Sequence, residues 1–303
     1  MNIILGPVHS RRFGKSLGVD LSPGKKQCNF DCLYCELDPA KTMDAYDDVV
    51  SVKEIADAIK TALTEHQDID FITLTANGEP TLYPHLSVLI DEINTFKDTT
   101  KTLILSNAAN IDDIKVQDAL LKLDEVKLSL DCATQKCLQK LDRSHSGINV
   151  ENIKAGMLDF KSKYDGPLVI EILIVKTLND SKEEISKLNK YLLKLQPTRI
   201  DIGTIDRPPA FDVKPVSYEE LLHISHLFDA SLPIYIASRK KADIDPSSYS
   251  EEQILETLSK RPLTLEDIEA LCDKESQKRV ENLLNTSKIK LVETNGVKFY
   301  KKA

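Results

Sequence analysis

Short runs rich in aliphatic and β-branched residues alternate with longer amphipathic stretches over residues 1–237, and this alternation restricts the fold most. Six of the short runs predict strands, at 16–21, 71–76, 101–106, 125–130, 168–175 and 199–205. Helical patterns lie near 52–66, 83–96, 113–122, 149–163, 181–195 and 217–230, with Ser51, Ser181 and Ser217 as candidate N-caps. Such alternation predicts right-handed βαβ units and a parallel sheet.

The predicted strands are almost continuously apolar, as expected of strands that are covered on both faces. Six βα units fit either an open doubly wound sheet or a partial barrel. In both folds, functional groups gather at the carboxyl ends of the strands. We therefore expect the active residues in the loops that follow the strands.

The pattern changes after residues 233–237, which are a candidate further strand. The polar segment 238–248 predicts a linker. Residues 249–303 predict three helices and a hairpin, with Asn295-Gly296 at the hairpin turn. This order of elements predicts a winged-helix-like domain. The predicted division is therefore 1–237, 238–248 and 249–303.

Charge and hydropathy exclude several classes of protein. The 40 Lys and Arg residues against 48 Asp and Glu give a net charge of −8, so any nucleic-acid contact has to be local. The first apolar run is too short for a signal peptide, and no stretch approaches about 18 apolar residues. We expect a soluble, cytoplasmic protein without a membrane partner.

Three of the six cysteines lie in "CNFDCLYC", residues 28–35, directly after the first predicted strand. In a reducing compartment a tight cysteine cluster indicates a metal or redox site rather than a disulfide. Three thiolates on a [4Fe-4S] cluster leave one iron open, as a catalytic metal site requires. The alternatives are a Cys3His zinc site and a redox C-x2-C motif. The separate Cys132 and Cys137 are expected to be buried, inert thiols.

The second predicted strand ends in "TANGEPTL", residues 75–82. This motif places the Glu79 carboxylate in a tight turn at the carboxyl edge of a parallel strand, near the cysteine loop. A ligand ammonium could be bound there. The alternative is an ordinary surface turn with a solvated glutamate.

Together the two motifs resemble those of the radical S-adenosylmethionine (SAM) enzymes, whose hallmark is C-x3-C-x-aromatic-C, here with Tyr34 in the aromatic position. The resemblance covers residues 1–237 and implies an α/β partial (β/α)6 TIM-like barrel. It implies that Cys28, Cys32 and Cys35 hold a [4Fe-4S] cluster and that SAM binds the open iron. Reductive cleavage of SAM would then yield a 5′-deoxyadenosyl radical. The implied partner is a low-potential electron donor of flavodoxin or ferredoxin type.

The same resemblance suggests further SAM-binding positions. Tyr34 would lie beside the adenine. Gly78 and Glu79 match the family's Gly-Gly-Glu motif for the SAM amino group, and Asn77 replaces its first glycine. Other polar candidates are Asn107, Ser129 and Asp131 at strand ends, and Arg143. Strand-end capping, or a surface salt bridge for Arg143, is the alternative for these four, and no catalytic residue is identified.

The lead-in "GPVHSRRFGKSLGVD" and the "NGEPTL", "SLDCAT" and "RPPA" segments resemble one branch, the wyosine-type tRNA-modifying radical SAM proteins. This favours a tRNA base as substrate, with a peptide or small metabolite as the alternative. An iron–sulfur redox-sensing DNA-binding regulator is a third reading. The chain departs from the archaeal branch members in having no second cysteine triad.

Basic residues concentrate near the start of the chain. Residues 1–27 contain five basic side chains and one acidic side chain, Asp20, for a net charge of +4; Arg11 and Arg12 are the candidate RNA contacts. A solvated basic segment is the alternative. Residues 248–303 carry ten basic and ten acidic residues, less basic than a strong phosphate-binding domain, which leaves two alternatives for this region: nucleic-acid contact, and a protein-interaction or lid role.

Overall fold

The computed structural model describes residues 2–10, 14–236, 246, 248–260, 262–294 and 297–303. An eight-stranded sheet runs in chain order from β1 to β8, with β1 antiparallel to β2 and the other pairs parallel. The six predicted strands and the candidate strand near 233–237 are confirmed, whereas β1 was missed. The strands are β1 (Ile4–Ser10), β2 (Gly14–Asp20), β3 (Phe71–Thr75), β4 (Lys101–Ser106), β5 (Glu125–Ser129), β6 (Leu168–Ile174), β7 (Arg199–Thr204) and β8 (Ile234–Ile236).

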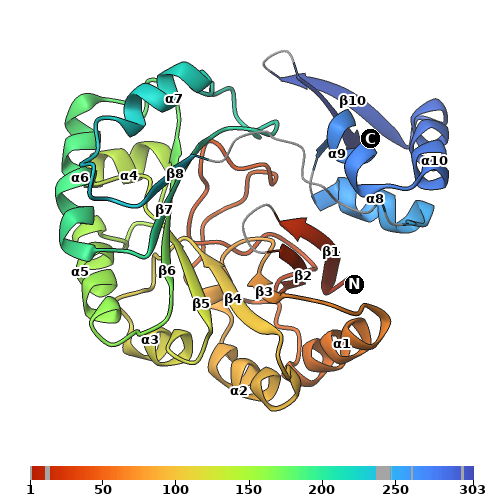
Figure 1. The fold of residues 1–303 in the computed structure, drawn as a ribbon, viewed down its shortest axis with the longest axis horizontal. Helices are drawn as coiled ribbons and strands as arrows, with labels where there is room; N and C mark the ends of the chain where they lie inside the picture. The colour runs from red at the N-terminus through yellow and green to blue at the C-terminus, as the bar shows by residue number, and fades with distance from the viewer. Residues whose placement is uncertain (1, 11–13, 237–245, 247, 261, 295–296) are drawn as a thin grey trace.

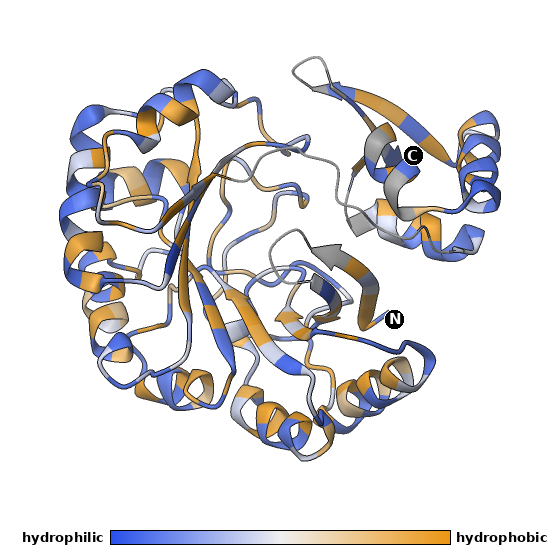
Figure 2. Ribbon diagram, viewed as in Figure 1, coloured by the Kyte–Doolittle hydropathy of each residue, from blue (hydrophilic) through white to orange (hydrophobic). Residues whose placement is uncertain are grey.

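Helices cover the outer side of this curved sheet, and their apolar sides face the strands (Figures 1 and 2). Side chains of Ser51, Ser181 and Ser217 cap three of them, as predicted. Helix α4 was not predicted. The helices are α1 (Val52–Glu65), α2 (Leu86–Phe96), α3 (Ile114–Leu120), α4 (Gln135–Leu141), α5 (Val150–Lys161), α6 (Lys182–Leu195) and α7 (Tyr218–Ser225), with a 3-10 turn at Pro80–Leu82.

The two faces of the sheet differ in chemistry. On β2, Leu17 and Val19 are fully buried, while Ser16, Gly18 and Asp20 line a cavity on the other face. Since helices cover only the outer face, the doubly wound alternative is wrong (Figure 1). In the described residues the sheet is an open, curved α/β sheet with β1 and β8 as its edges. The finer TIM-like description stays a prediction.

Residues 249–303 form a second unit with its own hydrophobic cluster, which includes Leu258, Val280, Leu283 and Phe299. The three predicted helices and the hairpin are present, and the short strand β9 adds a third strand in the order β10-β11-β9. The winged-helix assignment stays a prediction. The elements are α8 (Glu251–Lys260), β9 (Leu263–Thr264), α9 (Leu265–Leu271), α10 (Lys274–Asn285), β10 (Ile289–Thr294) and β11 (Val297–Lys302).

This C-terminal unit lies beside β1 and β2, on the open side of the curved sheet (Figure 1). Asn2 Nδ2 donates a hydrogen bond to Glu256, and Lys301 Nζ lies 4.0 Å from a carboxylate oxygen of Asp38. Most of the predicted linker and the Asn295-Gly296 turn lie outside the described residues. None of the described helices has the length and apolar character needed to cross a membrane.

Candidate functional site

The cysteine loop follows β2, and main-chain hydrogen bonds fix it to several segments. Cys28, Cys32 and Cys35 are all half-buried and free of disulfides. Leu33 N–H donates to the carbonyl of Leu141 at the end of α4 (2.9 Å), and Ala210 N–H donates to the carbonyl of Cys35 (2.9 Å). Parts of the chain far apart in sequence therefore hold the three thiols in place.

The turn at 77–79 pairs directly with the residue before the first cysteine. Gln27 N–H donates to the carbonyl of Asn77, and Glu79 N–H donates to the carbonyl of Gln27, both at 2.9 Å. Gly78 has φ +137°, and a Cβ there would lie 1.9 Å from the Gln27 carbonyl oxygen. Only glycine permits this approach. The two sequence motifs are thus joined through the backbone.

The Glu79 side chain is 1% exposed and accepts hydrogen bonds from the chain itself. Its Oε1 accepts from Thr81 N–H (2.9 Å), Thr81 Oγ1 (2.6 Å) and Ser106 Oγ (2.7 Å). Its Oε2 accepts from Asn107 N–H at 2.7 Å. Burial raises the pKa of this carboxyl, while these bonds favour the charged form. Glu79 therefore holds the ends of β3 and β4 together. A ligand that binds this carboxyl would do so at Oε2, which accepts one hydrogen bond, whereas Oε1 already accepts three.

Asn107 connects this carboxyl to the cysteine loop. Its Nδ2 donates to Asn29 Oδ1 at 2.7 Å and lies 3.7 Å from Cys28 Sγ, within the range of a hydrogen bond to sulfur. Phe30 N–H also donates to Cys28 Sγ, at 3.4 Å. Hydrogen bonds to the sulfur of a cysteine ligand tune the redox potential of the cluster that it holds.

Tyr34 and Asp131 meet across the site. The Tyr34 hydroxyl donates to Asp131 Oδ2, and Leu173 N–H donates to Asp131 Oδ1 at 2.7 Å. Burial raises the pKa of the Asp131 carboxyl to about 7. Ser129 and Asn107 lie with Tyr34 and Asp131 around a small cavity of about 20 Å³. The structure therefore brings four of the predicted residues together.

Asp142 lines the same small cavity and was missed by the sequence analysis, which selected its neighbour. Its side chain is buried, burial raises its pKa, and its Oδ1 has no hydrogen-bond partner. No sequence signal identified it, because α4 itself was not predicted and Asp142 is the C-cap residue that follows it. A buried carboxyl whose raised pKa favours the neutral form, and whose Oδ1 has no partner among the described residues, can exchange a hydrogen bond with a ligand.

Arg143 lies apart from this group. Its side chain is 46% exposed, 3.5 Å from Asp31 and stacked over the ring of Phe211. The predicted RNA contacts Arg11 and Arg12 lie outside the described residues. The described lysines of the basic segment have partners: Lys15 donates to the Gln67 carbonyl, Lys25 pairs with Asp47, and Lys26 pairs with Asp31 at 3.3 Å.

The three thiols of the cysteine loop have the chemistry that an iron–sulfur cluster requires of its ligands. Burial raises the pKa of Cys28 to about 12 and also raises those of Cys32 and Cys35, so thiolates here require a neighbouring cation, which bound iron supplies. Three free thiols in one loop, with Asn107 Nδ2 and Phe30 N–H directed at the Cys28 sulfur, fit a cluster that leaves one iron open.

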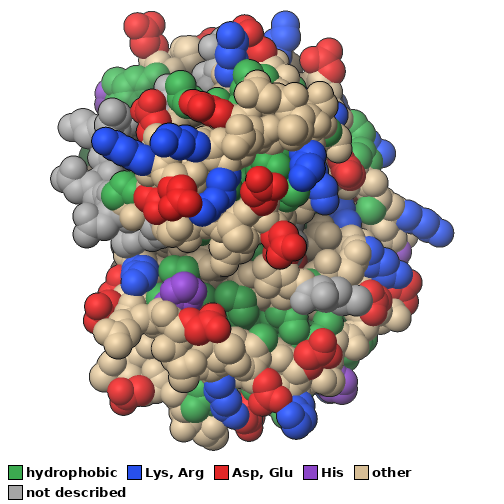
Figure 3. Space-filling view, turned by 90° about the vertical axis from the view of Figure 1, so that its right-hand side faces the viewer, with side chains coloured by type: hydrophobic (Ala, Val, Ile, Leu, Met, Phe, Trp, Pro, Cys, Tyr) green, Lys and Arg blue, Asp and Glu red, His purple; other side chains and the backbone are tan. Residues whose placement is uncertain are grey.

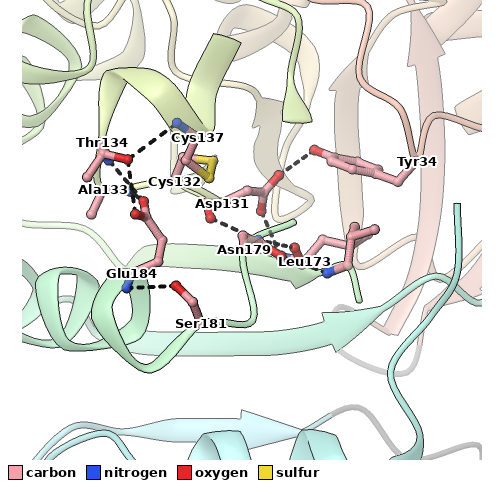
Figure 4. The surroundings of a disulfide bond; sticks show 11 residues. Tyr34, Asp131, Cys132, Ala133, Thr134, Cys137, Leu173, Asn179, Ser181 and Glu184 are labelled. Atoms are coloured by element: carbon pink, nitrogen blue, oxygen red, sulfur yellow. Dashed lines mark hydrogen bonds between the residues drawn. A yellow bond between two sulfur atoms is a disulfide. The ribbon is translucent and has the colours of Figure 1, made fainter. Parts of the chain in front are cut away.

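The prediction that Cys132 and Cys137 are two free thiols is wrong. Cys132 and Cys137 form a disulfide at the start of α4, close to Asp131 (Figure 4). Glu184 Oε1 accepts from Ala133 N–H and Thr134 N–H, and Asn179 Nδ2 donates to the carbonyl of Asp131 at 2.9 Å. Both cysteines are buried, as expected. The disulfide thus forms part of the support behind Asp131.

A cavity of about 580 Å³ opens beside Tyr34 and Cys35. Its walls come from β1 to β4 and β6 of the sheet, the cysteine loop, the segment after β7 and the C-terminal unit. This volume lies in the range of small-molecule and cofactor sites, roughly 300–1,000 Å³. Viewed from the side of the C-terminal unit, the surface is hollowed between two bodies, with hydrophobic side chains along the hollow (Figure 3).

Comparisons with known proteins agree with these features. Residues 25–188 match the family model described as the Radical SAM superfamily. The chain is 41% identical over 302 residues to a UPF0026 protein of Helicobacter pylori strain J99, covering 98% of this chain and 97% of that protein. It is 32% identical over 129 residues to an S-adenosyl-L-methionine-dependent tRNA 4-demethylwyosine synthase of rice, covering 43% of this chain and 18% of that protein.

A solved structure has a similar fold. The crystal structure of a radical SAM methyltransferase from Sphaerobacter thermophilus superposes with a TM-score of 0.57 at 15% identity. The match covers 74% of this chain and 67% of that chain. At this identity the likeness concerns the fold alone.

Proposed function

The chain belongs to the radical SAM superfamily, and from this premise we propose which residues bind its cofactors and what it modifies. As a member of this superfamily it is an enzyme that uses a [4Fe-4S] cluster and SAM. With both bound, the cluster would supply one electron for cleavage of SAM into methionine and a 5′-deoxyadenosyl radical able to abstract a hydrogen atom from the substrate. The chain's own residues have to position SAM, exclude water and admit the substrate.

In this proposal Cys28, Cys32 and Cys35 hold the cluster, and Asn107 donates a hydrogen bond to the Cys28 sulfur. Support comes from the chemistry of the donor set: three free thiols in one loop, and raised thiol pKa values that require a cation. A low-potential donor of flavodoxin or ferredoxin type supplies the electron, since radical SAM enzymes need a reductant.

SAM is proposed to bind between the turn at Asn77, Gly78 and Glu79 and the rim formed by Tyr34, Asn107, Ser129 and Asp131. The observation that carries this assignment is the main-chain pairing of Gln27 with Asn77 and Glu79, because it fixes the turn beside the first cysteine. Asp142, with its unpartnered Oδ1, joins the proposed set. Arg143 is proposed only as an outer contact, since it pairs with Asp31.

The proposed substrate is a base of tRNA. Two observations favour it over a peptide or small metabolite: the sequence lead-in at residues 6–20 and the similarity to the rice tRNA enzyme over 129 residues. Arg11 and Arg12 stay candidate RNA contacts. A DNA-binding redox regulator is disfavoured as the function of this chain, because such a regulator requires no SAM site.

The test is mass spectrometry of tRNA nucleosides from a strain that lacks the gene, compared with the parent strain. We expect one modified nucleoside to disappear and its precursor to accumulate. Purified enzyme with SAM, dithionite and tRNA from the deletion strain should restore the nucleoside. An unchanged tRNA profile would refute the tRNA assignment and direct the search to peptides and small metabolites.

A further inference from the structure

The curved sheet and the C-terminal unit have separate hydrophobic cores. The 580 Å³ cavity lies between them and takes its walls from both. Away from its lining residues, Asn2 pairs with Glu256, and Lys301 lies 4.0 Å from Asp38, whose side chain is 93% exposed. Ligand sites occur preferentially at such domain interfaces. The space between the two bodies is therefore shaped to be filled by a ligand.

The wall that the C-terminal unit contributes carries no charged side chain. It consists of Tyr249, Ile254, Thr257, Leu263, Ile268 and Cys272. Ile254, Leu263, Ile268 and Cys272 also belong to the core of the unit, so this wall is a rigid surface rather than a loop. It borders the same cavity as Tyr34 and Cys35 of the cysteine loop.

The charged groups of the cavity come from the other walls. They are the carboxylates of Asp20, Glu36 and Asp206 and one guanidinium, Arg207. Arg207 Nη1 donates to both Glu36 carboxylate oxygens, at 3.1 and 3.0 Å. Three carboxylates and one paired cation make these walls repel phosphate, and an uncharged group is favoured only at the C-terminal wall, whose lining side chains carry no charge.

We propose that residues 249–303 form the substrate wall of the reaction chamber and select an uncharged, planar group for the cluster side of the cavity. This inference rests on the proposed function, under which the group is a base of tRNA. Enzymes that act on a base extrude it into a pocket lined by apolar side chains, while its phosphates remain outside. Ile254, Thr257 and Ile268 contact the ring, and the Glu36–Arg207 pair forms its polar edge.

The experiment places one larger side chain on this wall, so that it occupies part of the cavity. Thr257 faces the cavity from α8, while Ser259 lies exposed on the same helix, and both hydroxyls bond to the helix main chain. We compare Thr257→Trp with the control Ser259→Trp in cluster-loaded enzyme. Thr257→Trp should keep its iron content, since Thr257 lies outside the cysteine loop, yet lose at least tenfold of the stimulation by unmodified tRNA. Ser259→Trp should behave as wild type.

A second readout is independent of the reaction. Cys272 lines the cavity, and it is the described free cysteine outside the cluster loop. Its alkylation by iodoacetamide, followed by peptide mass spectrometry, should slow several-fold in Thr257→Trp and not in Ser259→Trp. The smaller Thr257→Leu should give an intermediate rate, and it serves if the tryptophan variant fails to fold.

The outcomes separate the two proposals. If tRNA does not stimulate wild-type enzyme, the tRNA assignment fails, and the alkylation rates alone decide whether the wall borders the cavity. If tRNA stimulates wild type and Thr257→Trp equally, or if alkylation of Cys272 is the same in all variants, the assignment of this wall is wrong.

Discussion

Two groups of cysteines lie after strands of the same sheet, and they differ in oxidation state. Cys28, Cys32 and Cys35 follow β2 as free thiols, whereas Cys132 and Cys137 follow β5 as a disulfide. The first group lies against polar groups that can serve a cofactor, such as Asn107 beside Cys28. The second is buried behind Asp131 and stabilises a turn. Position at a strand end therefore does not by itself make a cysteine a ligand.

The largest expected effect distinguishes the two groups directly. Cys32→Ala should abolish cluster binding, because the two remaining thiolates cannot retain three irons of the cluster. Iron content, the visible absorption of the cluster and 5′-deoxyadenosine release should all fall to background. Cys272→Ser is the control and should retain all three. A Cys32→Ala protein that still releases 5′-deoxyadenosine would refute the assignment of the loop.

Gly78→Ala should disturb the cysteine loop without touching a cysteine. The new Cβ would lie 1.9 Å from the Gln27 carbonyl oxygen, at a φ of +137°. We expect a loss of about 3 kcal/mol or more in the free energy of unfolding, together with poor cluster incorporation. Gly203→Ala is the matched control, since a Cβ there meets no atom within 4 Å. Equal melting temperatures for the two variants would contradict the pairing of Gln27 with the turn.

Glu79→Gln tests whether the carboxyl that holds β3 and β4 together also serves SAM. An amide nitrogen cannot accept the hydrogen bonds that both carboxylate oxygens receive. The variant should lose about 1–3 kcal/mol of stability, measured by denaturant unfolding. Glu92→Gln, which breaks a surface pair with Lys60, should lose less than about 1 kcal/mol. A weaker SAM affinity in Glu79→Gln, at a temperature where it is folded, indicates a direct ligand role; unchanged affinity indicates a structural role alone.

The smallest effect on cluster binding and SAM cleavage is expected at the disulfide pair, Cys132 and Cys137. The double variant Cys132→Ser/Cys137→Ser should bind a normal amount of iron and release 5′-deoxyadenosine. Under non-reducing conditions it should lose about 2 kcal/mol of stability, the amount expected for a cross-link that closes a short loop. Loss of the cluster in this variant would show that the two cysteine groups are not independent.

A thiol count examines the same comparison in the wild-type protein. Cluster-free protein, denatured and alkylated without reductant, should carry label on the four free cysteines Cys28, Cys32, Cys35 and Cys272. Prior reduction should raise the number of labelled cysteines to all six in the chain. Six labels without reduction would exclude the disulfide.

The sequence by itself determined the parallel strands, most helices and the place of the two motifs. Apolar periodicity and N-cap residues act locally, so Ser51 and Ser217 could be identified without coordinates. The C-x3-C-x2-C spacing likewise fits within one loop. Strand β1 and helix α4 were missed because β1 is interrupted by Gly6 and Pro7 and α4 has only seven residues.

Only the tertiary structure decided which side chains meet. Glu79 accepts hydrogen bonds from Ser106 and Asn107 because the ends of β3 and β4 are adjacent, a relation between residues that are 27 and 28 positions apart and that no local pattern contains. The choice of Asp142 over Arg143 depends on how the chain leaves α4, because the C-cap Asp142 is buried whereas Arg143, with φ +47°, has a half-exposed side chain. The wall contributed by residues 249–303 depends on where a separate unit docks, and docking follows from surfaces formed only after both units have folded.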